Sequence, residues 1–249
     1  MNVLRRFFIA LLDRVLVPRV CVLCGNPLAA GSPYVCTACM ASVPVCRADG
    51  VEMLDLRARI VNAAAPVGLV SAWSLYDPSH PTAGLVRMSK YGDAPGLARW
   101  LGRQYGRDLL RSCEHVEKTS DGEILPSDID VLLPMPMHRG KLLDRGYNQA
   151  EMIARGISDV TGIPVGDNLV AVRPHRTQTR LDNQARMSNI AGCFAVECGE
   201  ELRGLNVAVV DDVITTGASM CEAAGAVSRG APGVASVSFL ALARTMRGI

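Results

Sequence analysis

The sequence has few aromatic residues, almost no net charge and no long apolar run. Phe, Trp and Tyr make up 4% of the 249 residues, and the formal net charge is +2. Such a small imbalance gives no argument for a nucleic acid or a membrane surface as partner. No apolar run reaches the roughly 20 residues that a membrane-spanning helix needs. The chain is long enough for one large globular domain and a small second one.

Two common phosphate-binding signatures are also missing. The chain has no G-x-x-x-x-G-K-[ST] loop and no G-x-G-x-x-G turn. These absences argue against a P-loop nucleotide hydrolase and against a dinucleotide-binding domain, because each depends on its glycine-rich loop to approach phosphate groups closely.

The N-terminus resembles a secretory signal only superficially. Arg5 and Arg6 precede an apolar run at 7–12, but Asp13 and Arg14 interrupt that run where a signal peptide would continue apolar. The spacing of apolar residues predicts an amphipathic helix instead. We therefore expect a cytoplasmic protein.

Cysteine is the one residue type whose placement stands out. There are nine cysteines, an odd number that does not favour a disulfide framework. Four of them form two C-x-x-C pairs separated by eleven residues: Cys21, Cys24, Cys36 and Cys39. The other five are scattered along the chain without an evident pairing.

The two C-x-x-C pairs predict a structural zinc site. Each pair places two thiolates on one tight turn, and two turns brought together supply four sulfur ligands at about 2.3 Å from one ion. Gly25 and the Gly31-Ser32-Pro33 stretch provide turn residues between the pairs. A thioredoxin-type redox motif is disfavoured, because no strand and helix flank either pair. The four cysteines leave no open coordination position, so the metal is expected to stabilise the fold rather than to catalyse.

From Pro66 onward the sequence alternates between strand and helix patterns. We expect an α/β domain with a parallel sheet and helices on both faces, because short buried strands are separated by helical segments. The expected strands are 67–76, 129–134, 207–210 and 234–243, and the expected helices lie near 97–109, 146–161 and 218–229. Ligands of such sheets bind beyond the carboxyl ends of the strands.

The stretch VAVVDDVITTGAS at 207–219 carries the strongest chemical signal. A buried strand leads into Asp211 and Asp212 and then into a turn with hydroxyls and a glycine before a helix. Backbone N–H groups at a helix N-terminus form a favourable site for phosphate. The two carboxylates are acceptors for the paired hydroxyls of a ribose. The pattern therefore predicts a ribose 5-phosphate site.

The same stretch resembles the phosphoribosyl-pyrophosphate (PRPP) signature of type I phosphoribosyltransferases. With the N-terminal four-cysteine module, the whole chain is similar to the ComF family of competence-associated proteins. Further family-like segments are KYGD at 90–93, LPMPMHRGKLLDRGYNQA at 133–150 and RTQTRLDNQARMSN at 176–189. The resemblance implies a phosphoribosyltransferase-like sheet and a small module like a zinc ribbon.

The resemblance also implies ligands and site residues. It implies PRPP with Mg²⁺, and transfer of ribose 5-phosphate to a nitrogenous acceptor that the sequence does not identify. The residues expected to bind PRPP are Asp211, Asp212, Thr215, Thr216, Gly217, Ala218, Ser219, Lys90, Met137, Arg139 and Arg145. Asp211, Asp212 and Arg180 are expected to take part in catalysis. The alternative interpretation of the cations at 139–145 is a solvated basic turn.

An arginine-rich segment at 173–189 has three interpretations. It is a solvent-exposed loop, a lid that closes over PRPP, or a contact for nucleic acid, since arginines bind phosphate backbones without sequence preference. The alternative to an enzyme is a non-catalytic module that senses PRPP or a nucleotide and binds single-stranded DNA or proteins of the competence machinery.

We expect two domains. Residues 1–50 would hold an N-terminal helix and the zinc module. Residues 51–249 would form the phosphoribosyltransferase-like domain, with a hood at roughly 67–125 and a core at roughly 126–249. The hood, around 67–91, is expected to choose the acceptor.

Overall fold

The chain forms two compact units, and each is described by itself. The computed structural model describes residues 19–29, 31–46, 58, 66–80, 82–91, 94–114, 126–173 and 190–245. The first unit spans Met1–Pro44 and the second Val45–Ile249. The predicted boundary after residue 50 and the division into hood and core stay predictions. None of the described helices has the length and apolar character to cross a membrane.

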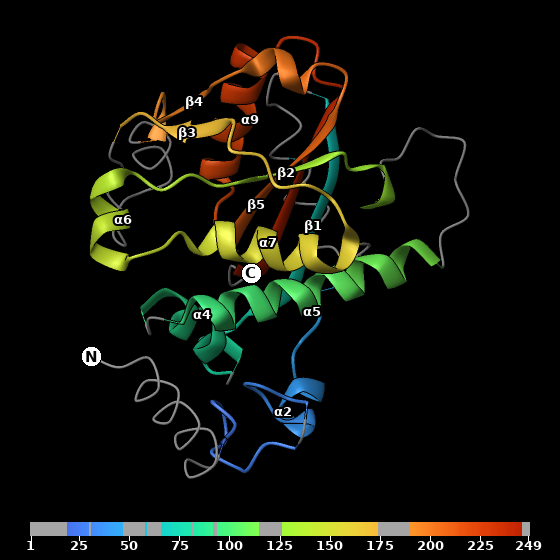
Figure 1. The fold of residues 1–249 in the computed structure, drawn as a ribbon, viewed down its shortest axis with the longest axis vertical. Coiled ribbons are helices and arrows are strands. Elements are labelled where there is room, and N and C mark those ends of the chain that lie inside the picture. The colour runs from blue at the N-terminus through green and yellow to red at the C-terminus, as the bar shows by residue number, and fades with distance from the viewer. Residues whose placement is uncertain are drawn as a thin grey trace, which may run out of the picture. The chain divides into compact units, whose positions relative to one another are not determined.

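The second unit is an α/β fold, as the strand and helix patterns predicted (Figure 1). Its elements are β1 (Val67–Tyr76), α4 (Thr82–Tyr91), α5 (Pro95–Glu114), η1 (Pro126–Asp128), β2 (Val131–Pro134), α6 (Arg139–Arg145), α7 (Gln149–Thr161), β3 (Leu169–Ala171), β4 (Phe194–Val196), η2 (Gly199–Leu202), β5 (Asn206–Ile214), α9 (Ala218–Gly230) and β6 (Ser236–Thr245).

Four parallel strands make the central sheet, in the order β1-β6-β5-β2. The first of them, β1, comes from the segment expected to belong to the hood, and it pairs along β6 from Val67 to Tyr76. This strand therefore belongs to the sheet that also carries β5. Strands β3 and β4 form a separate antiparallel pair.

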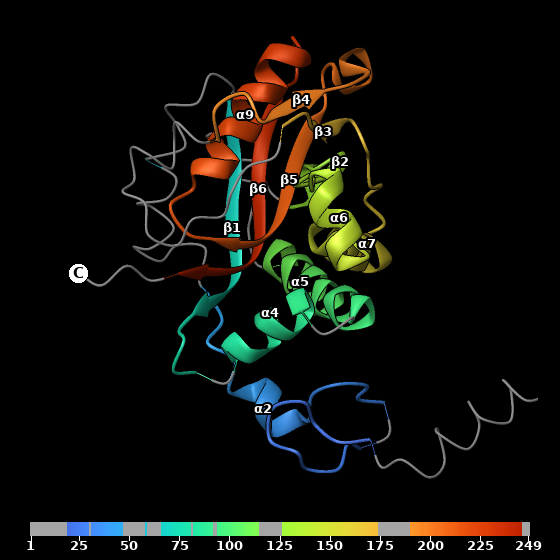
Figure 2. The same ribbon diagram turned by 90° about the vertical axis from the view of Figure 1, so that its left-hand side faces the viewer.

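Side chains of the central strands are buried on both faces of the sheet. In β5, Val207 and Val209 join a cluster with Ala223 and Val227 of α9. The alternating residues Ala208 and Val210 are equally buried, and strand geometry places them on the opposite face. There α7 packs on β5 and β2, and α5 packs on α7 (Figure 2). Helices therefore cover both faces, as expected.

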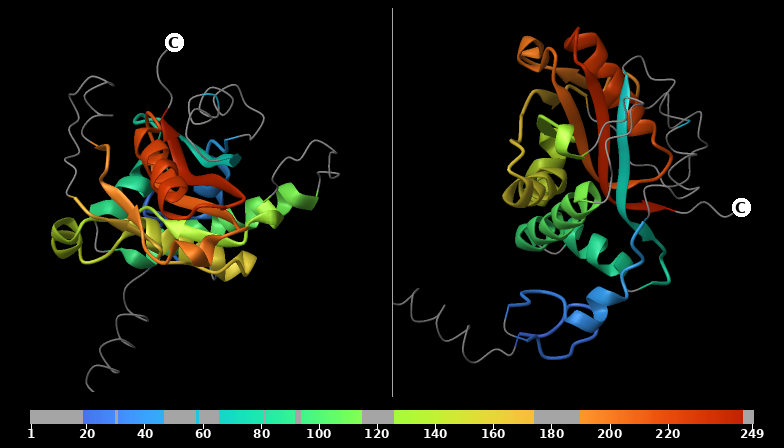
Figure 3. Two further views of the ribbon diagram at one scale, coloured as in Figure 1. Left: turned by 90° about the horizontal axis from the view of Figure 1, so that it is seen from above. Right: turned by 90° about the vertical axis from the view of Figure 1, so that its right-hand side faces the viewer.

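Glycines let α5 and α7 approach closely. A Cβ added to Gly102 would overlap the Ile153 carbonyl oxygen, and one added to Gly156 would overlap the Arg99 carbonyl oxygen. Figure 3 shows the two helices running alongside each other. The packing is extensive because neither glycine has a side chain to hold the backbones apart.

An ion pair also joins these two helices. The Asp159 carboxylate of α7 accepts hydrogen bonds from Arg99 at 2.6 and 2.8 Å and from Arg103 at 2.7 Å. The bonds from Arg99, followed by the charge and bonds of Arg103, lower the pKa of Asp159 to about 2. The carboxylate is therefore ionised at neutral pH, and both arginines remain paired with it.

The close helix contact gives a stability prediction. We expect Gly156→Ala to lower the free energy of unfolding by about 1–3 kcal/mol, because the added methyl group forces α5 and α7 apart. Gly140→Ala in α6 is the matched control, since its Cβ would meet only the His138 side chain at 3.6 Å; it should be neutral or stabilising by up to about 1 kcal/mol. Urea unfolding of both variants measures the difference. Equal midpoints for the two would contradict the close packing.

Candidate functional site

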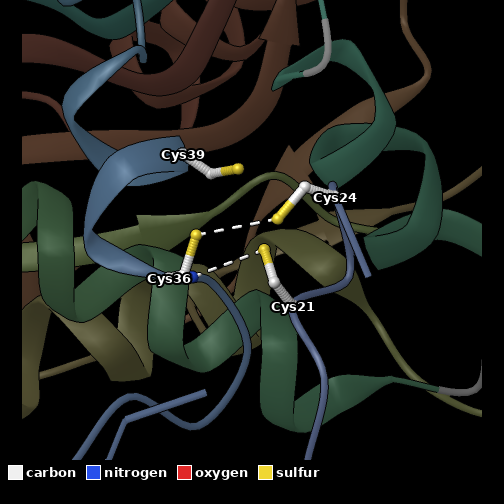
Figure 4. A group of neighbouring side chains, drawn as sticks. All are labelled: Cys21, Cys24, Cys36 and Cys39. Atoms are coloured by element: carbon white, nitrogen blue, oxygen red, sulfur yellow. Dashed lines mark hydrogen bonds between the residues drawn. The ribbon is translucent and has the colours of Figure 1, made fainter. Parts of the chain in front are cut away.

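The four cysteines of the first unit converge on one point (Figure 4). Their sulfur atoms all lie within 4.8 Å of one another. The Cys24 and Cys36 sulfurs are 3.8 Å apart. Four sulfurs around a zinc ion at about 2.3 Å form a tetrahedron with edges of about 3.8 Å. The geometry therefore fits the predicted metal.

Two short chain reversals bring the cysteines together. Residues 19–28 form a hairpin, in which the Cys21 N–H donates to Asn26 O at 2.8 Å and Leu28 N–H to Arg19 O at 2.8 Å. Gly25, with φ of 74°, closes the turn after Cys24 in a backbone region that favours glycine. Cys36 then occupies the N-cap position of helix α2 (Thr37–Ala41), which carries Cys39.

Backbone N–H groups stabilise negative charge on Cys21. Burial acts to raise the pKa of the Cys21 thiol, but N–H donors of Cys36, Cys24 and Leu23 outweigh burial and lower this pKa to about 6. The Cys36 N–H lies 3.4 Å from the Cys21 sulfur. Hydrogen bonds to the Cys24 and Cys36 thiols raise the pKa of Cys39 to about 12. The negative charge on these sulfurs favours a cation. A divalent ion that binds there would displace the remaining thiol protons.

The second candidate site lies where β5 runs into α9. The sequence analysis ended this strand at Val210, and that boundary is wrong. Strand β5 continues to Ile214, because β6 extends beside it and pairs Asp211 with Ala241 and Ile214 with Arg244. Asp211 and Asp212 are therefore strand residues, three or four positions before the turn.

Strand β5 extends beyond its neighbour β2. The last register pair of β2 joins Pro134 to Val210, and the Met135 N–H donates to Val210 O at 2.7 Å. In the described part of the chain, no strand pairs with β5 on that side beyond Val210. The edge of β5 that carries the two aspartates therefore opens at the carboxyl end of the sheet, where α/β folds bind ligands.

The two carboxylates are half-buried and belong to opposite faces of β5. Successive side chains alternate along a strand, so Asp211 follows the face of Val209 and Asp212 the face of Val210. The Asp212 N–H donates to Asp211 Oδ1 at 2.8 Å. The alternation reduces the repulsion that adjacent acids would otherwise suffer. A ligand contacting both must lie over the open edge of the strand.

The turn from 215 to 217 has the predicted form. Gly217 is the N-cap of α9 with φ of 80°, so this position favours glycine. The Ala218 N–H donates to Thr216 Oγ1 at 3.3 Å. Thr215 is exposed, whereas Thr216, Ala218 and Ser219 are partly buried. The sequence-predicted residues 211–219 therefore lie together on one continuous strand, turn and helix.

The structure does not bring the other predicted PRPP residues together with residues 211–219. Met137 and Arg139 follow β2 and line a cavity of about 720 Å³, whose lining includes no residue from 211–219. Arg145 donates to Gln149 Oε1 at 3.1 Å. Lys90 lies in α4, but its side chain is outside the described structure, as are Arg180 and the rest of 174–189.

Two residues at this end of the sheet were missed. Arg244 is buried in β6 and pairs in register with Ile214; a charged residue directly after the apolar run FLALA was the available signal. The Tyr147 hydroxyl donates to Ser89 O at 2.6 Å, and so ties the chain before α7 to the residue preceding Lys90. No sequence pattern indicated that contact.

Comparisons with known proteins give relatives over most of the chain. DNA utilization protein YhgH of Salmonella typhimurium is 27% identical over 238 residues, which are 92% of this chain and 99% of that protein. YhgH of Escherichia coli K12 is 26% identical with the same coverage. Competence protein F of Haemophilus influenzae is 31% identical over 125 residues, 49% of this chain and 53% of that protein. No family model matches the chain.

Solved structures give only weak similarity. The allosteric regulatory enzyme of purine biosynthesis has a TM-score of 0.34 and 20% identity, covering 58% of this chain and 26% of that one. A purine phosphoribosyltransferase from Pyrococcus horikoshii has a TM-score of 0.29 and 17% identity, covering 57% and 82%.

The cysteine cluster predicts one bound zinc ion per chain. Protein expressed with zinc should contain it stoichiometrically, and Cys24→Ser should lose it, because three remaining thiolates leave the tetrahedral site incomplete. Elemental analysis measures the metal, and limited proteolysis should show new cleavage within 19–46. Cys198→Ser is the control, because Cys198 is an exposed thiol outside the cluster. Equal zinc content in the two variants would refute the site.

Proposed function

We propose that this chain binds PRPP with Mg²⁺ and transfers ribose 5-phosphate to a nitrogenous acceptor. It is homologous to DNA utilization proteins over 92% of its length and to competence protein F over 49%. The observation that carries the proposal is the open edge of β5, where Asp211 and Asp212 precede the Gly217 turn and α9. One strand, turn and helix thus offer acceptors for a sugar and donors for a phosphate.

The turn would hold the 5-phosphate. Helix α9 has 13 residues, so its N-terminus carries the unsatisfied N–H groups and the favourable dipole that suit an anion. A phosphate oxygen would replace Thr216 as acceptor of the Ala218 N–H, whose present bond is long at 3.3 Å. The hydroxyls of Thr215, Thr216 and Ser219 would add donors.

The aspartates would hold the ribose hydroxyls and the cation. Carboxylates accept hydrogen bonds from both hydroxyls of a vicinal diol, and a ligand over the β5 edge would reach the carboxylates on either face. Mg²⁺ is commonly bound through one or two carboxylates and substrate phosphates, which fits this donor set. When bound, Mg²⁺ would neutralise charge on the diphosphate.

The reaction is a substitution at the anomeric carbon. A nitrogen of the acceptor forms the new bond to that carbon, the carbon–oxygen bond to the diphosphate breaks, and the diphosphate leaves with the electron pair. The acceptor nitrogen loses its proton to solvent water. Arg139 and Arg145 would neutralise the departing diphosphate, and Arg180 would contribute to catalysis.

The predicted segments outside the strand and turn complete the proposal. Acceptor choice would depend on the predicted hood, around 67–91. The arginine-rich segment 173–189 would act as a lid or contact single-stranded DNA, and competence proteins are further candidate partners. The odd number of cysteines, which does not favour a disulfide framework, favours a cytoplasmic location.

Removing the acidic pair tests the binding site. The double variant Asp211→Asn with Asp212→Asn should bind PRPP and Mg²⁺ at least about tenfold more weakly, because each charged hydrogen bond contributes about 1.5–3 kcal/mol. Isothermal titration measures the affinity. Asp144→Asn, an exposed acid on α6, is the control and should bind as the wild type does. No binding by the wild-type chain would remove the proposal.

Turnover separates an enzyme from a module that only senses PRPP. A transferase should release pyrophosphate from PRPP when a suitable base or amine is added, and the Asp211/Asp212 double variant should not. A screen of bases and amines with a coupled pyrophosphate assay makes the measurement. Tight PRPP binding with no acceptor-dependent release across the screen would favour the sensing module, because a phosphate and ribose site does not require bond cleavage.

A further inference from the structure

Strand β3 has one paired edge and one unpaired edge. Its pairing with β4 matches Leu169 to Val196, Val170 to Ala195 and Ala171 to Phe194. The Val172 N–H donates to Cys193 O at 2.9 Å, and the Glu197 N–H to Asn168 O at 2.8 Å.

These two bonds set which backbone groups face β4. In an antiparallel pair, hydrogen-bonded positions alternate along the strand. Positions 168, 170 and 172 therefore bond to β4, and the N–H and C=O groups of Leu169 and Ala171 point to the other edge. Within the described chain, no residue bonds to the backbone of either one on that side.

The unpaired edge faces the cavity of about 720 Å³. Four consecutive residues, 169–172, line it. Because side chains alternate across a strand, a run of consecutive lining residues means that the strand presents its backbone edge, not one of its faces. The opposite wall comes from Pro136, Leu142 and Arg155, on the chain after β2, on α6 and on α7. In Figure 1, α6 and α7 lie below the β3–β4 pair, consistent with this lining.

The cavity has an acidic end. Asp167 and Glu197 line it at the start of β3, and both are exposed. The charge of Glu201, then burial, then the charges of Glu200, Glu197 and Asp167 raise the pKa of the Cys198 thiol. The other acid of the lining, Glu151, is neutralised by Arg155 at 2.6 Å. Arg139, the first residue of α6, also lines the cavity, so the negative charge of the lining is confined to Asp167 and Glu197, beside the first residue of the unpaired edge.

Exposed apolar side chains lie along the rest of the cavity. Val172 is 54% exposed and Leu142 is 38% exposed, and both line it. An exposed apolar wall beside an unpaired strand edge suits a partner that supplies both backbone hydrogen bonds and apolar side chains.

We propose that the β3 edge binds an extended segment of a partner protein by strand addition, with apolar residues at alternate positions and a Lys or Arg at the end beside Asp167 and Glu197. The segment's backbone pairs with the N–H and C=O groups of Leu169 and Ala171. Its apolar side chains contact Leu142 and Val172. Its basic residue pairs with the carboxylates of Asp167 and Glu197. These two acids therefore select a partner segment with a Lys or Arg at that end.

Peptide selection on the full-length protein tests the proposal. Random dodecapeptides displayed on phage are selected on the wild-type chain and then titrated by fluorescence anisotropy as synthetic peptides. The expected peptides alternate apolar and polar residues and carry Lys or Arg near one end. Methylation of the backbone nitrogen at alternate positions should abolish binding of the same peptide, because it removes the donors of the paired edge.

Two variants with a matched control locate the contact. Ala171→Pro removes an N–H that bonds to nothing within the described fold, so the fold is retained, and peptide affinity should fall about fivefold or more. Asp167→Lys with Glu197→Lys should reject the basic peptides and select acidic ones. Glu200→Lys is the control, because Glu200 is exposed nearby but does not line the cavity.

Each of the following results would overturn the proposed strand addition. The proposal is overturned if no selected peptide binds the wild type more tightly than Ala171→Pro. It is also overturned if the Asp167/Glu197 variant still prefers basic peptides. Selection of peptides that bind only as helices also overturns it. Titration with PRPP on the same variants keeps this test separate from the proposed transferase. None of Ala171, Asp167 and Glu197 is among the residues proposed to bind PRPP, although Met137 and Arg139 line the same cavity, so PRPP affinity should stay unchanged while peptide affinity falls.

Discussion

The pairing of β5 with a longer neighbour on one side and a shorter neighbour on the other is the constraint on which the candidate site depends. Strand β6 keeps the backbone of β5 extended as far as Ile214, whereas β2 ends opposite Val210. The unequal lengths expose one edge of the strand that carries both aspartates. The turn and the N-terminus of α9 follow directly in the chain. The carboxylate acceptors of β5 and the N–H donors of α9 are therefore neighbours because they are consecutive in sequence.

Helices α5 and α7, which cover one face of the sheet, hold the chain that follows β2 in place. Gly102 and Gly156 let α5 and α7 pack closely. The first residue before α7, Asn148, both caps the helix through the Ala150 N–H and donates to Met135 O at 3.0 Å. The chain leaving β2 is thus attached to the helix that covers β5, and the positions of Met137 and Arg139 depend on the same contact.

Much of this could be predicted from local sequence. The T-T-G turn, the helix after it and the four converging cysteines each depend on residues a few positions apart, and each was found. The end of β5 was missed, because it depends on pairing with β6, some thirty residues later, and acidic residues alone suggested a loop. The unpaired edge of β3 was also missed, since only the register with β4 reveals which N–H groups point away. The arginine-rich segment stays a prediction.

The β3–β4 pair also bears on the length of the connection between its two strands. The Val172 N–H donates to Cys193 O, and the Arg173 guanidinium donates to the carbonyls of Ala191 and Gly192, so the described residues on either side of 174–189 are held together. The closure entropy of the connection is offset by the strands themselves, and doubling its length would cost only about 0.6 kcal/mol more. A change in the length of this connection therefore costs little folding free energy, so the β3–β4 pair alone does not fix how many residues join its strands.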